Sequence, residues 1–511
     1  MSSTLPEQSG GTVQDRVQQG RRNAFLFAGA AGLAGLMFGL DTGVIAGALK
    51  FLGQDLKAND RALEWIVSSL MLGAAAGSLL AIPLSHHRGR RGAMFYAGLL
   101  FLLGTALCSL TSSIPVMILG RVCLGLGVGF ASFSAPLYIA EITEKSRRGK
   151  MISMYQLVIT AGMLLALLSD SLLSYGGHWR WMLGILAVPT VVFILATMQV
   201  PYSPRWLAMR GRRKEAHTVL QQVRGSKQRA TEELNRIEEN LRKTEGNGFS
   251  LLKSSSGFRK TFALGIGLQV FQQFAGINIL MYYAPHILEH LGFSTSAAVW
   301  CTTLLGLANM VSTFGAILLI DRWGRRPLLL VSTVVASLSL AIFGTLLYLH
   351  VGGVFGQIAI VSLLVLFILG YAFGEGPIPW TMCTEIQPLQ GRTLAIACST
   401  FANWMTNWLI SNVFLSVMGA IHDYGVFWLL AGFNAVFFLI GHFFVPETKD
   451  CSLEEIEDRL KAGFPLREIG QPSRLQGAPA MVAPGRAAVP VRIYKARNVT
   501  PLFGCKILCS S

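Results

Sequence analysis

Twelve long apolar segments constrain this chain more than any other feature of its sequence. Each holds about 20 mostly hydrophobic residues between charged or turn residues, enough to cross the ~30 Å hydrocarbon core of a bilayer as a helix. The first lies near residues 24–49 and the last near residues 425–445. With 52% hydrophobic and only 14% charged residues, a soluble globule could not bury this much apolar surface. We therefore predict an all-α polytopic membrane protein with twelve transmembrane helices.

The formal net charge of +16 reflects where the Lys and Arg residues lie. If the N-terminus is inside, most of them fall on connections of one side, at residues 88–91, 145–150, 205–260 and 322–326. The other side carries little beyond Lys50, Lys57, Arg61 and Arg180. Because positive loops mark the cytoplasmic side, we expect both termini in the cytoplasm. A nucleic-acid surface would need these cations on one soluble face, so no nucleic-acid partner is expected.

Local patterns recur between the two parts of the chain. Gly89-Arg90-Arg91 returns 235 residues later as Gly324-Arg325-Arg326, and Pro201 returns 245 residues later as Pro446. We therefore predict two homologous, pseudo-symmetric six-helix halves with a central site that opens alternately to either side. The predicted divisions are a cytoplasmic N-terminal segment (1–23), the N-terminal half (24–201), a cytoplasmic linker with short helices (202–260), the C-terminal half (261–446) and a cytoplasmic tail (447–511).

Charged residues at the predicted cytoplasmic side form a candidate gate. Asp321 precedes Arg325 by four residues, a spacing that places opposite charges on one helix face. Ordinary solvated ion pairs at the membrane edge would give the same pattern. We instead interpret these charged residues as a gate, in which charge networks join the halves when the protein faces outward and break when it faces inward. The candidate gate residues are Glu141, Arg148, Asp321, Arg325, Glu385 and Arg392.

An acid and a base lie at similar depth inside the predicted spans. Asp41 is ~12 Å from the outer end of the first span and Arg121 is ~10 Å from that of the fourth. Because a charge near the membrane centre is costly, we expect the two to neutralise each other or to line a wet cavity. A permanent ion pair that holds helices together is one interpretation. The other, which we favour, is a proton switch in which Asp41 titrates and Arg121 tunes its proton affinity.

Uncharged amides gather in the seventh span. Gln269, Gln272 and Gln273 share one helical face with Gly276, and Asn278 follows. Amides offer donors and acceptors without charge, which suits a neutral polyhydroxylated ligand, although helix–helix hydrogen bonding is the alternative. Further neutral polar groups of the same kind lie in other spans. They are Gln156, Asn309, Asn403, Asn407 and the indole of Trp380.

Several longer motifs run through the chain to about Gly470. They include Gly39-Leu-Asp-Thr-Gly-Val-Ile-Ala-Gly47, Pro136-Leu-Tyr-Ile-Ala-Glu141, Ser203-Pro-Arg-Trp-Leu207, Gln272-Gln-Phe-Ala-Gly-Ile-Asn278, Asp321-Arg-Trp-Gly-Arg-Arg326, Gly376-Pro-Ile-Pro-Trp380 and Pro446-Glu-Thr-Lys449. This set resembles the sugar porter family of the major facilitator superfamily, in particular bacterial sugar–proton symporters of the arabinose and galactose type. The resemblance implies the major facilitator fold and transport of a monosaccharide of the arabinose, galactose, glucose or xylose class.

The resemblance also implies roles for single residues. Asp41 and Arg121 would couple proton movement to transport, and the uniporting glucose facilitators lack an acid at the position of Asp41. Residues that would bind sugar are Gln156, Gln272, Gln273, Asn278, Trp380 and Asn403, with Gln269 and Asn309 lining the site in some relatives. We expect no enzymatic activity, cofactor, metal or obligate protein partner, and a location in the bacterial inner membrane. A facilitator without proton coupling and a non-transporting sugar sensor remain alternatives.

Three positions depart from the family pattern. No acid precedes Gly89, and Tyr202 stands where the family commonly has Glu or Asn. Glu375 is an extra carboxyl group just before the interrupted part of the tenth span. We interpret Glu375 either as a solvated side chain in the cavity or as an added proton site that could shift substrate preference.

Overall fold

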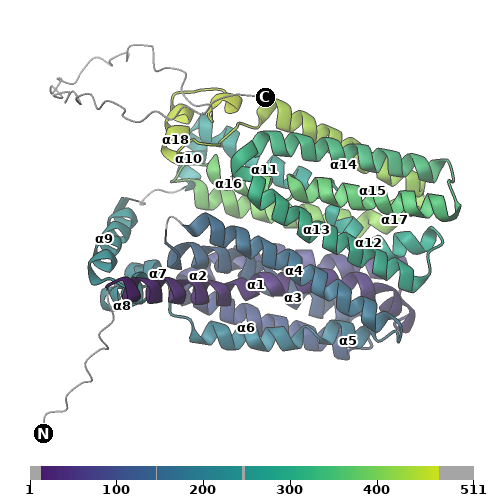
Figure 1. Cartoon of the computed structure of the whole chain (residues 1–511), viewed down its shortest axis with the longest axis horizontal. Coiled ribbons are helices and arrows are strands. Elements are labelled where there is room, and N and C mark those ends of the chain that lie inside the picture. The colour runs from purple at the N-terminus through teal and green to yellow at the C-terminus, as the bar shows by residue number, and fades with distance from the viewer. Residues whose placement is uncertain (1–12, 145–146, 244–247, 471–511) are drawn as a thin grey trace, which may run out of the picture. The chain divides into compact units, whose positions relative to one another are not determined.

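The computed structural model describes residues 13–144, 147–243 and 248–470, and the regular structure in them is helical (Figure 1). Most of the tail that begins at residue 447, and residues 1–12 of the N-terminal segment, therefore lie outside the described residues. The helices are α1 (Val13–Asp55), α2 (Asp60–Leu110), α3 (Ile114–Ile142), α4 (Arg148–Ser174), α5 (Trp179–Gly184), α6 (Ala187–Gln199), α7 (Pro204–Met209), α8 (Arg213–Arg224), α9 (Lys227–Lys243), α10 (Gly248–Ser254), α11 (Ser256–Phe274), α12 (Ile277–His290), α13 (Thr295–Trp323), α14 (Arg325–Tyr348), α15 (Gly353–Phe373), α16 (Ile378–Glu385), α17 (Arg392–Phe444), α18 (Leu453–Lys461) and the 3₁₀ turn η2 (Leu466–Glu468).

Ten helical stretches of the described chain are long and apolar enough to cross a membrane. Two of them, α2 and α17, have 51 and 53 residues, about twice the length that one crossing needs. Each is two helices joined at a residue with non-helical, positive φ, Gly89 in α2 and His422 in α17. The ten stretches therefore make twelve crossings, which confirms the predicted twelve-helix fold.

Two crossings of the C-terminal half are interrupted within the membrane. Gly276, with φ +97°, separates α11 from α12, and the segment around Gly374 separates α15 from α16. The Pro377 ring removes a backbone donor just where α16 begins, so the helix cannot run through. We call residues 374–377 the α15/α16 break. Both interruptions expose backbone groups to polar side chains at mid-membrane depth.

Small residues let the helices of the N-terminal half pack closely. A Cβ on Gly39 of α1 would collide with the carbonyl oxygen of Ile159 on α4, and one on Gly125 of α3 would collide with that of Leu70 on α2. Lipid tails are as apolar as Leu, so such close contact rather than burial from water holds membrane helices together. These contacts fix α1 and α3, the helices that carry Asp41 and Arg121.

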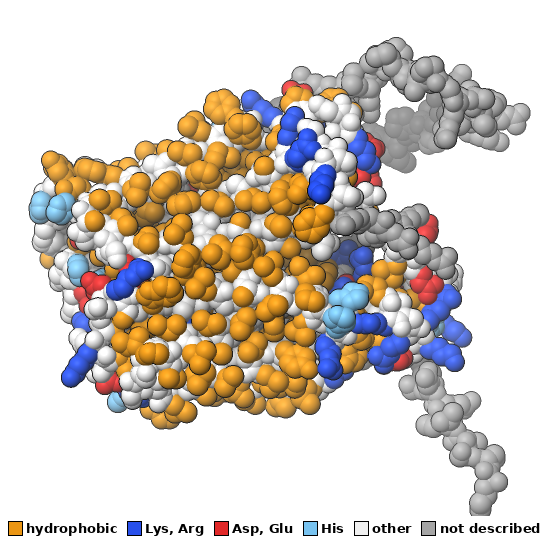
Figure 2. Space-filling view, turned by 180° about the vertical axis from the view of Figure 1, so that it is seen from behind, with side chains coloured by type: hydrophobic (Ala, Val, Ile, Leu, Met, Phe, Trp, Pro, Cys, Tyr) orange, Lys and Arg blue, Asp and Glu red, His pale blue; other side chains and the backbone are white. Residues whose placement is uncertain are grey.

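Large hydrophobic side chains cover the outside of the helices, while Lys and Arg side chains gather toward the ends (Figure 2). Leu103, Val188 and Leu195 are more than half exposed. An apolar surface of this extent on a single chain marks contact with lipid. The protein is a multi-pass membrane protein.

The equivalent glycines of the internal repeat, Gly89 and Gly324, have nearly the same backbone conformation. Gly89 has φ 76° and ψ 168°, and Gly324 has φ 93° and ψ 167°. Both glycines precede an Arg-Arg pair and turn the chain between two crossings. We call the end of the molecule with these two turns the Gly-Arg-Arg end, and the end with Lys50, Glu64 and Glu289 the opposite end. The agreement confirms the two pseudo-symmetric halves.

The short helices α7 to α10 follow the sixth crossing. Helix α8 packs on the start of α1, where Asn23 Nδ2 donates to the carbonyl of Gln222 at 3.2 Å. Arg224 donates to the carbonyl of Ile142 at 2.9 Å and forms an ion pair with Glu233. Helices α8 and α9, in the segment between the halves, are thus attached to the N-terminal half.

Candidate functional site

Asp41 and Arg121 form a buried ion pair. Arg121 Nη1 lies 2.9 Å from Asp41 Oδ1, and each side chain is 1% exposed. Arg121 Nε also donates to the carbonyl of Ile66 at 3.3 Å. Asp41 Oδ2 has no hydrogen-bond partner among the described residues. One carboxyl oxygen of Asp41 is therefore free to take up a proton without breaking an existing hydrogen bond, and this would change the net charge of the pair from zero to +1.

Three of the predicted amides meet in the C-terminal half. Asn403 Nδ2 on α17 lies 2.7 Å from Gln269 Oε1 and 2.9 Å from Gln272 Oε1, both on α11. Gln272 Nε2 donates to the carbonyls of Glu375 and Gly376 at 3.0 and 2.7 Å. We call Gln269, Gln272 and Asn403 the amide cluster. It joins α11, α17 and the α15/α16 break.

The other predicted sugar contacts lie around this cluster or apart from it. Gln273 Oε1 accepts from Asn278 Nδ2 at 2.6 Å across the α11/α12 interruption. Asn309 on α13 lies 3.6 Å from the Met163 sulfur on α4 and so faces the N-terminal half. Gln156 is half-buried on α4, and Trp380 on α16 is 40% exposed. The structure shows no direct bond from Gln156 or Trp380 to the amide cluster.

An aromatic contact between the halves links α1, which carries Asp41, to α17, which carries Asn403. Phe38, one turn before Asp41 on α1, packs on Trp404, which follows Asn403 on α17, with ring centroids 5.6 Å apart. The aromatic contact thus joins the part of α1 near Asp41 to the part of α17 near Asn403. A shift of α1 at Asp41 would therefore displace α17 through these two rings.

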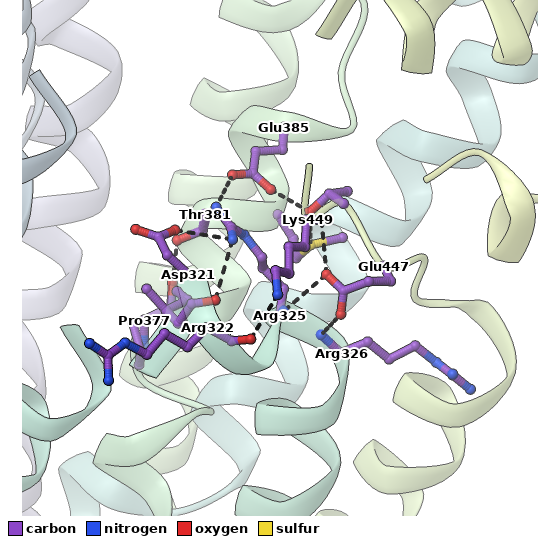
Figure 3. A network of polar contacts seen from close by, with 12 residues as sticks. Asp321, Arg322, Arg325, Arg326, Pro377, Thr381, Glu385, Glu447 and Lys449 are labelled. Atoms are coloured by element: carbon purple, nitrogen blue, oxygen red, sulfur yellow. Dashed lines mark hydrogen bonds and ion pairs between the residues drawn. The ribbon is translucent and has the colours of Figure 1, made fainter. Parts of the chain in front are cut away.

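At the Gly-Arg-Arg end each half builds the same three-residue network. In the N-terminal half, Glu141 accepts from Arg90 at 2.8 Å and from Ser203. In the C-terminal half, Glu385 accepts from Arg325 at 3.2 Å and from Thr448. Figure 3 shows the second network, with Asp321 also paired to Arg325 at 3.2 Å. Ser203 and Thr448 were missed by sequence reasoning, although their offset of 245 residues matches that of the repeat.

The two networks differ at one equivalent position. Glu447 accepts the backbone N–H groups of both Arg325 and Arg326 at 3.0 Å, and so caps the turn at Gly324 (Figure 3). Tyr202, 245 residues earlier, instead stacks on Trp206 at 5.0 Å and lies under the guanidinium of Arg91. The departure noted in the sequence therefore replaces a carboxylate cap with an aromatic stack.

The remaining candidate gate residues stay outside these networks. Arg392 donates to the carbonyl of Gln387 at 3.0 Å, and Arg148 is exposed at the start of α4. Among the described residues, no hydrogen bond or ion pair joins the halves 24–201 and 261–446 at the Gly-Arg-Arg end. Each network is closed within its own half in this conformation.

The opposite end, in contrast, is bridged between the halves. Glu64 on α2 is fully buried and accepts from the backbone N–H and hydroxyl of Ser416 on α17, at 2.8 and 2.9 Å. Arg61 pairs with Glu64 at 3.0 Å and donates to the carbonyl of Asn412 at 2.7 Å. Lys50 forms an ion pair with Glu289 at 2.6 Å. We call Arg61, Glu64, Asn412 and Ser416 the α2/α17 lock.

Sequence reasoning missed two fully buried acids, Glu64 and Asp170. Asp170 on α4 packs against Gly47 of α1, and neither carboxyl oxygen has a side-chain partner among the described residues. A charged residue inside an apolar run was the available signal in both cases. Glu375 is buried as well, in the α15/α16 break, so the solvated side chain considered from the sequence is not what the structure shows.

Known proteins resemble this chain over most of its length. The family model described as "Sugar (and other) transporter" matches residues 27–460. The galactose-proton symporter of Escherichia coli K12 is 43% identical over 462 residues, covering 90% of this chain and 99% of that protein. The arabinose-proton symporter of the same strain is 43% identical over 454 residues, covering 88% and 96%.

A solved structure agrees in fold. The major facilitator superfamily proton:xylose symporter XylE, bound to 6-bromo-6-deoxy-D-glucose, superposes with a TM-score of 0.73 at 28% identity, covering 86% of this chain and 99% of that one. The arrangement of twelve crossings in two halves is therefore the major facilitator fold. The chain belongs to the sugar transporter family of that superfamily.

Proposed function

We propose that this protein is a proton-coupled monosaccharide symporter that works by alternating access. Its relatives are named as proton symporters of galactose, arabinose and xylose. The observation that carries the proposal is the buried pair of Asp41 and Arg121, one carboxyl oxygen of which is unpaired, together with an uncharged amide cluster in the other half. A buried titratable pair next to a polar uncharged site supplies one site for a proton and one for a neutral sugar.

The same residues suggest the order of events. Protonation of Asp41 removes its charge and weakens its hold on Arg121, which keeps its bond to the Ile66 carbonyl. Asn403, Gln272, Gln273, Asn278 and Trp380 then bind the sugar mainly from the C-terminal half. The halves rock about the site, and the proton and sugar leave on the other side. No covalent step is needed, so we propose no enzymatic activity.

We further propose that the structure is the inward-facing conformation. The α2/α17 lock joins the halves at the opposite end, and the Gly-Arg-Arg networks leave them unjoined. The Gly-Arg-Arg end would then be cytoplasmic, in agreement with the distribution of Lys and Arg over the loops. Both chain termini would lie in the cytoplasm, and the membrane would be the bacterial inner membrane. On this assignment Glu141, Arg148, Asp321, Arg325, Glu385 and Arg392 form the cytoplasmic gate.

The test is sugar uptake by purified protein in proteoliposomes with an imposed pH gradient. We expect wild-type protein to accumulate one of galactose, arabinose, xylose or glucose above the external concentration. Asp41→Asn should abolish accumulation while leaving exchange of labelled sugar measurable, because the sugar site lies in the other half. If wild-type protein instead brings the sugar to equal concentrations on both sides, whatever the pH gradient, it is a facilitator. Binding without any flux would identify a sensor.

A further inference from the structure

Glu375 is a buried carboxyl group that the transport cycle proposed above does not use. It lies in the α15/α16 break and is 0% exposed. Neither Oε1 nor Oε2 has a hydrogen-bond partner among the described residues. An ionised carboxylate that is buried and unpaired in the membrane interior is strongly disfavoured. This burial therefore favours the protonated, neutral form of the carboxyl group.

No cation of the described chain neutralises Glu375. The titratable side chain beside it is Tyr371, one turn earlier on α15. Helix α14 contributes Ser332 and helix α11 contributes Gln272, and neither side chain ionises. The charged groups of these packed elements lie at the Gly-Arg-Arg end, where they are Arg259, Lys260, Asp321, Arg322, Arg325, Arg326 and Glu385.

The backbone of Glu375 is bonded directly to the amide cluster. Its N–H donates to Ser332 Oγ at 2.8 Å, and its carbonyl accepts from Gln272 Nε2 at 3.0 Å. The neighbouring carbonyl of Gly376 accepts from the same Nε2 at 2.7 Å. The α15/α16 break thus occupies both amide hydrogens of Gln272. To donate to a sugar hydroxyl, Gln272 must release at least one of these carbonyls.

We infer that Glu375 is a second proton-binding site, and that its proton competes with the sugar through Gln272. The inference rests on the proposed function, because it takes Gln272 as a sugar contact. While Glu375 is protonated, its side chain stays buried and the α15/α16 break keeps its hydrogen bonds to Gln272. When a sugar hydroxyl accepts a hydrogen bond from Gln272 Nε2, the α15/α16 break loses one of its bonds to Gln272 and loosens. Water then reaches the Glu375 carboxyl group, which transfers its proton to that water and becomes a carboxylate. By reciprocity, a proton returning to Glu375 weakens sugar binding and favours release.

Infrared difference spectroscopy on the purified full-length protein tests both parts. The C=O stretch of a protonated carboxyl group at Glu375 should be present without sugar and absent from Glu375→Gln. Adding D-galactose should reduce this band in wild-type protein. Asp170→Asn is the matched control, since it removes another fully buried, unpaired carboxyl group that has no bond to the amide cluster. It should leave the galactose-sensitive band unchanged.

Each result decides one part of the inference. A spectrum of sugar-free wild-type protein that matches Glu375→Gln overturns the proton site. A band that persists when galactose is bound overturns the competition. If galactose, arabinose, xylose and glucose all fail to bind, the proposed function falls together with the competition, while the sugar-free band still decides the proton site. Glu375→Asp, which keeps a carboxyl group and should shift the band, serves if Glu375→Gln does not fold.

Discussion

Asn403 is the residue on which the amide cluster depends, because its single Nδ2 bonds to both Gln269 and Gln272. Asn403→Ala would leave two buried amide oxygens without a donor. We expect the dissociation constant of the transported sugar to rise about tenfold or more, roughly 1.4 kcal/mol, measured by calorimetry on purified protein.

Gln387→Ala is the control for this substitution. Gln387 is an equally buried amide that bonds to Thr261 and lies outside the cluster. Its loss should lower thermal stability and leave the dissociation constant nearly unchanged. Equal losses of affinity in both variants would contradict a binding role for the cluster.

At this scale the sequence predicted some groupings and not others. The pairing of Asp41 with Arg121 could be predicted because residue counts along straight helices convert into depth. The shared face of Gln269 and Gln272 could be predicted from helical spacing. The partner of Glu64 could not, because Ser416 lies 352 residues away and neither residue belongs to a motif. Long-range pairs of this kind carry no local signal.

At the scale of elements, the turns at Gly89 and Gly324 are positions where the backbone conformation itself disfavours a side chain. Both glycines have positive φ, which costs L-residues about 1 kcal/mol or more. A Cβ on Gly324 would also lie 2.5 Å from a Glu447 carboxylate oxygen, whereas one on Gly89 would lie 3.1 Å from the Trp206 ring. Gly324→Ala should therefore lower the melting temperature in detergent more than Gly89→Ala does.

Gly267→Ala is the reference for these two variants. It lies in the middle of α11, where an added Cβ meets nothing within 4 Å. Its melting temperature should match the wild-type value or exceed it, because Ala favours the helix. A ranking in which Gly267→Ala is the least stable of the three would refute the argument from the turns.

The crossings could be predicted from the sequence, and so could the interruption of the tenth span near Pro377. Apolar run length sets the number of crossings, so twelve followed from the sequence and the fold confirms them. The turn at His422, where φ is 60°, could not be predicted, because His carries no turn signal in the sequence. The replacement of a carboxylate cap by the stack of Tyr202 on Trp206 also needed the structure, because the sequence shows that Tyr202 departs from the family pattern but not which side chain it contacts.

At the scale of the whole molecule, the α2/α17 lock sets which side is closed. Glu64 accepts from Arg61 and twice from Ser416, and Glu64→Gln would put an amide N–H group against these donors. We expect the population closed at this end to fall about tenfold, as the loss of charge-assisted hydrogen bonds implies. Spin labels at Leu110 and Leu349, in a cysteine-free background, should report longer distances between the halves.

Asp55→Asn is the matched control for the lock. Asp55 also pairs with an arginine at the opposite end, but its partner Arg180 belongs to the same half. Its removal should leave the distance between the labels unchanged. If Glu64→Gln and Asp55→Asn gave the same distances as wild-type protein, the α2/α17 lock would not control opening.

The contrast between Glu447 and Tyr202 gives the two halves different sensitivity to salt. In the C-terminal half a carboxylate holds the turn at Gly324, and added ions screen such contacts when they are partly exposed. In the N-terminal half stacked rings hold the equivalent turn, and ring stacking responds little to ionic strength. A protein built from two copies of one helical unit thus has one turn whose cap depends directly on ionic strength and an equivalent turn whose contacts depend on it less.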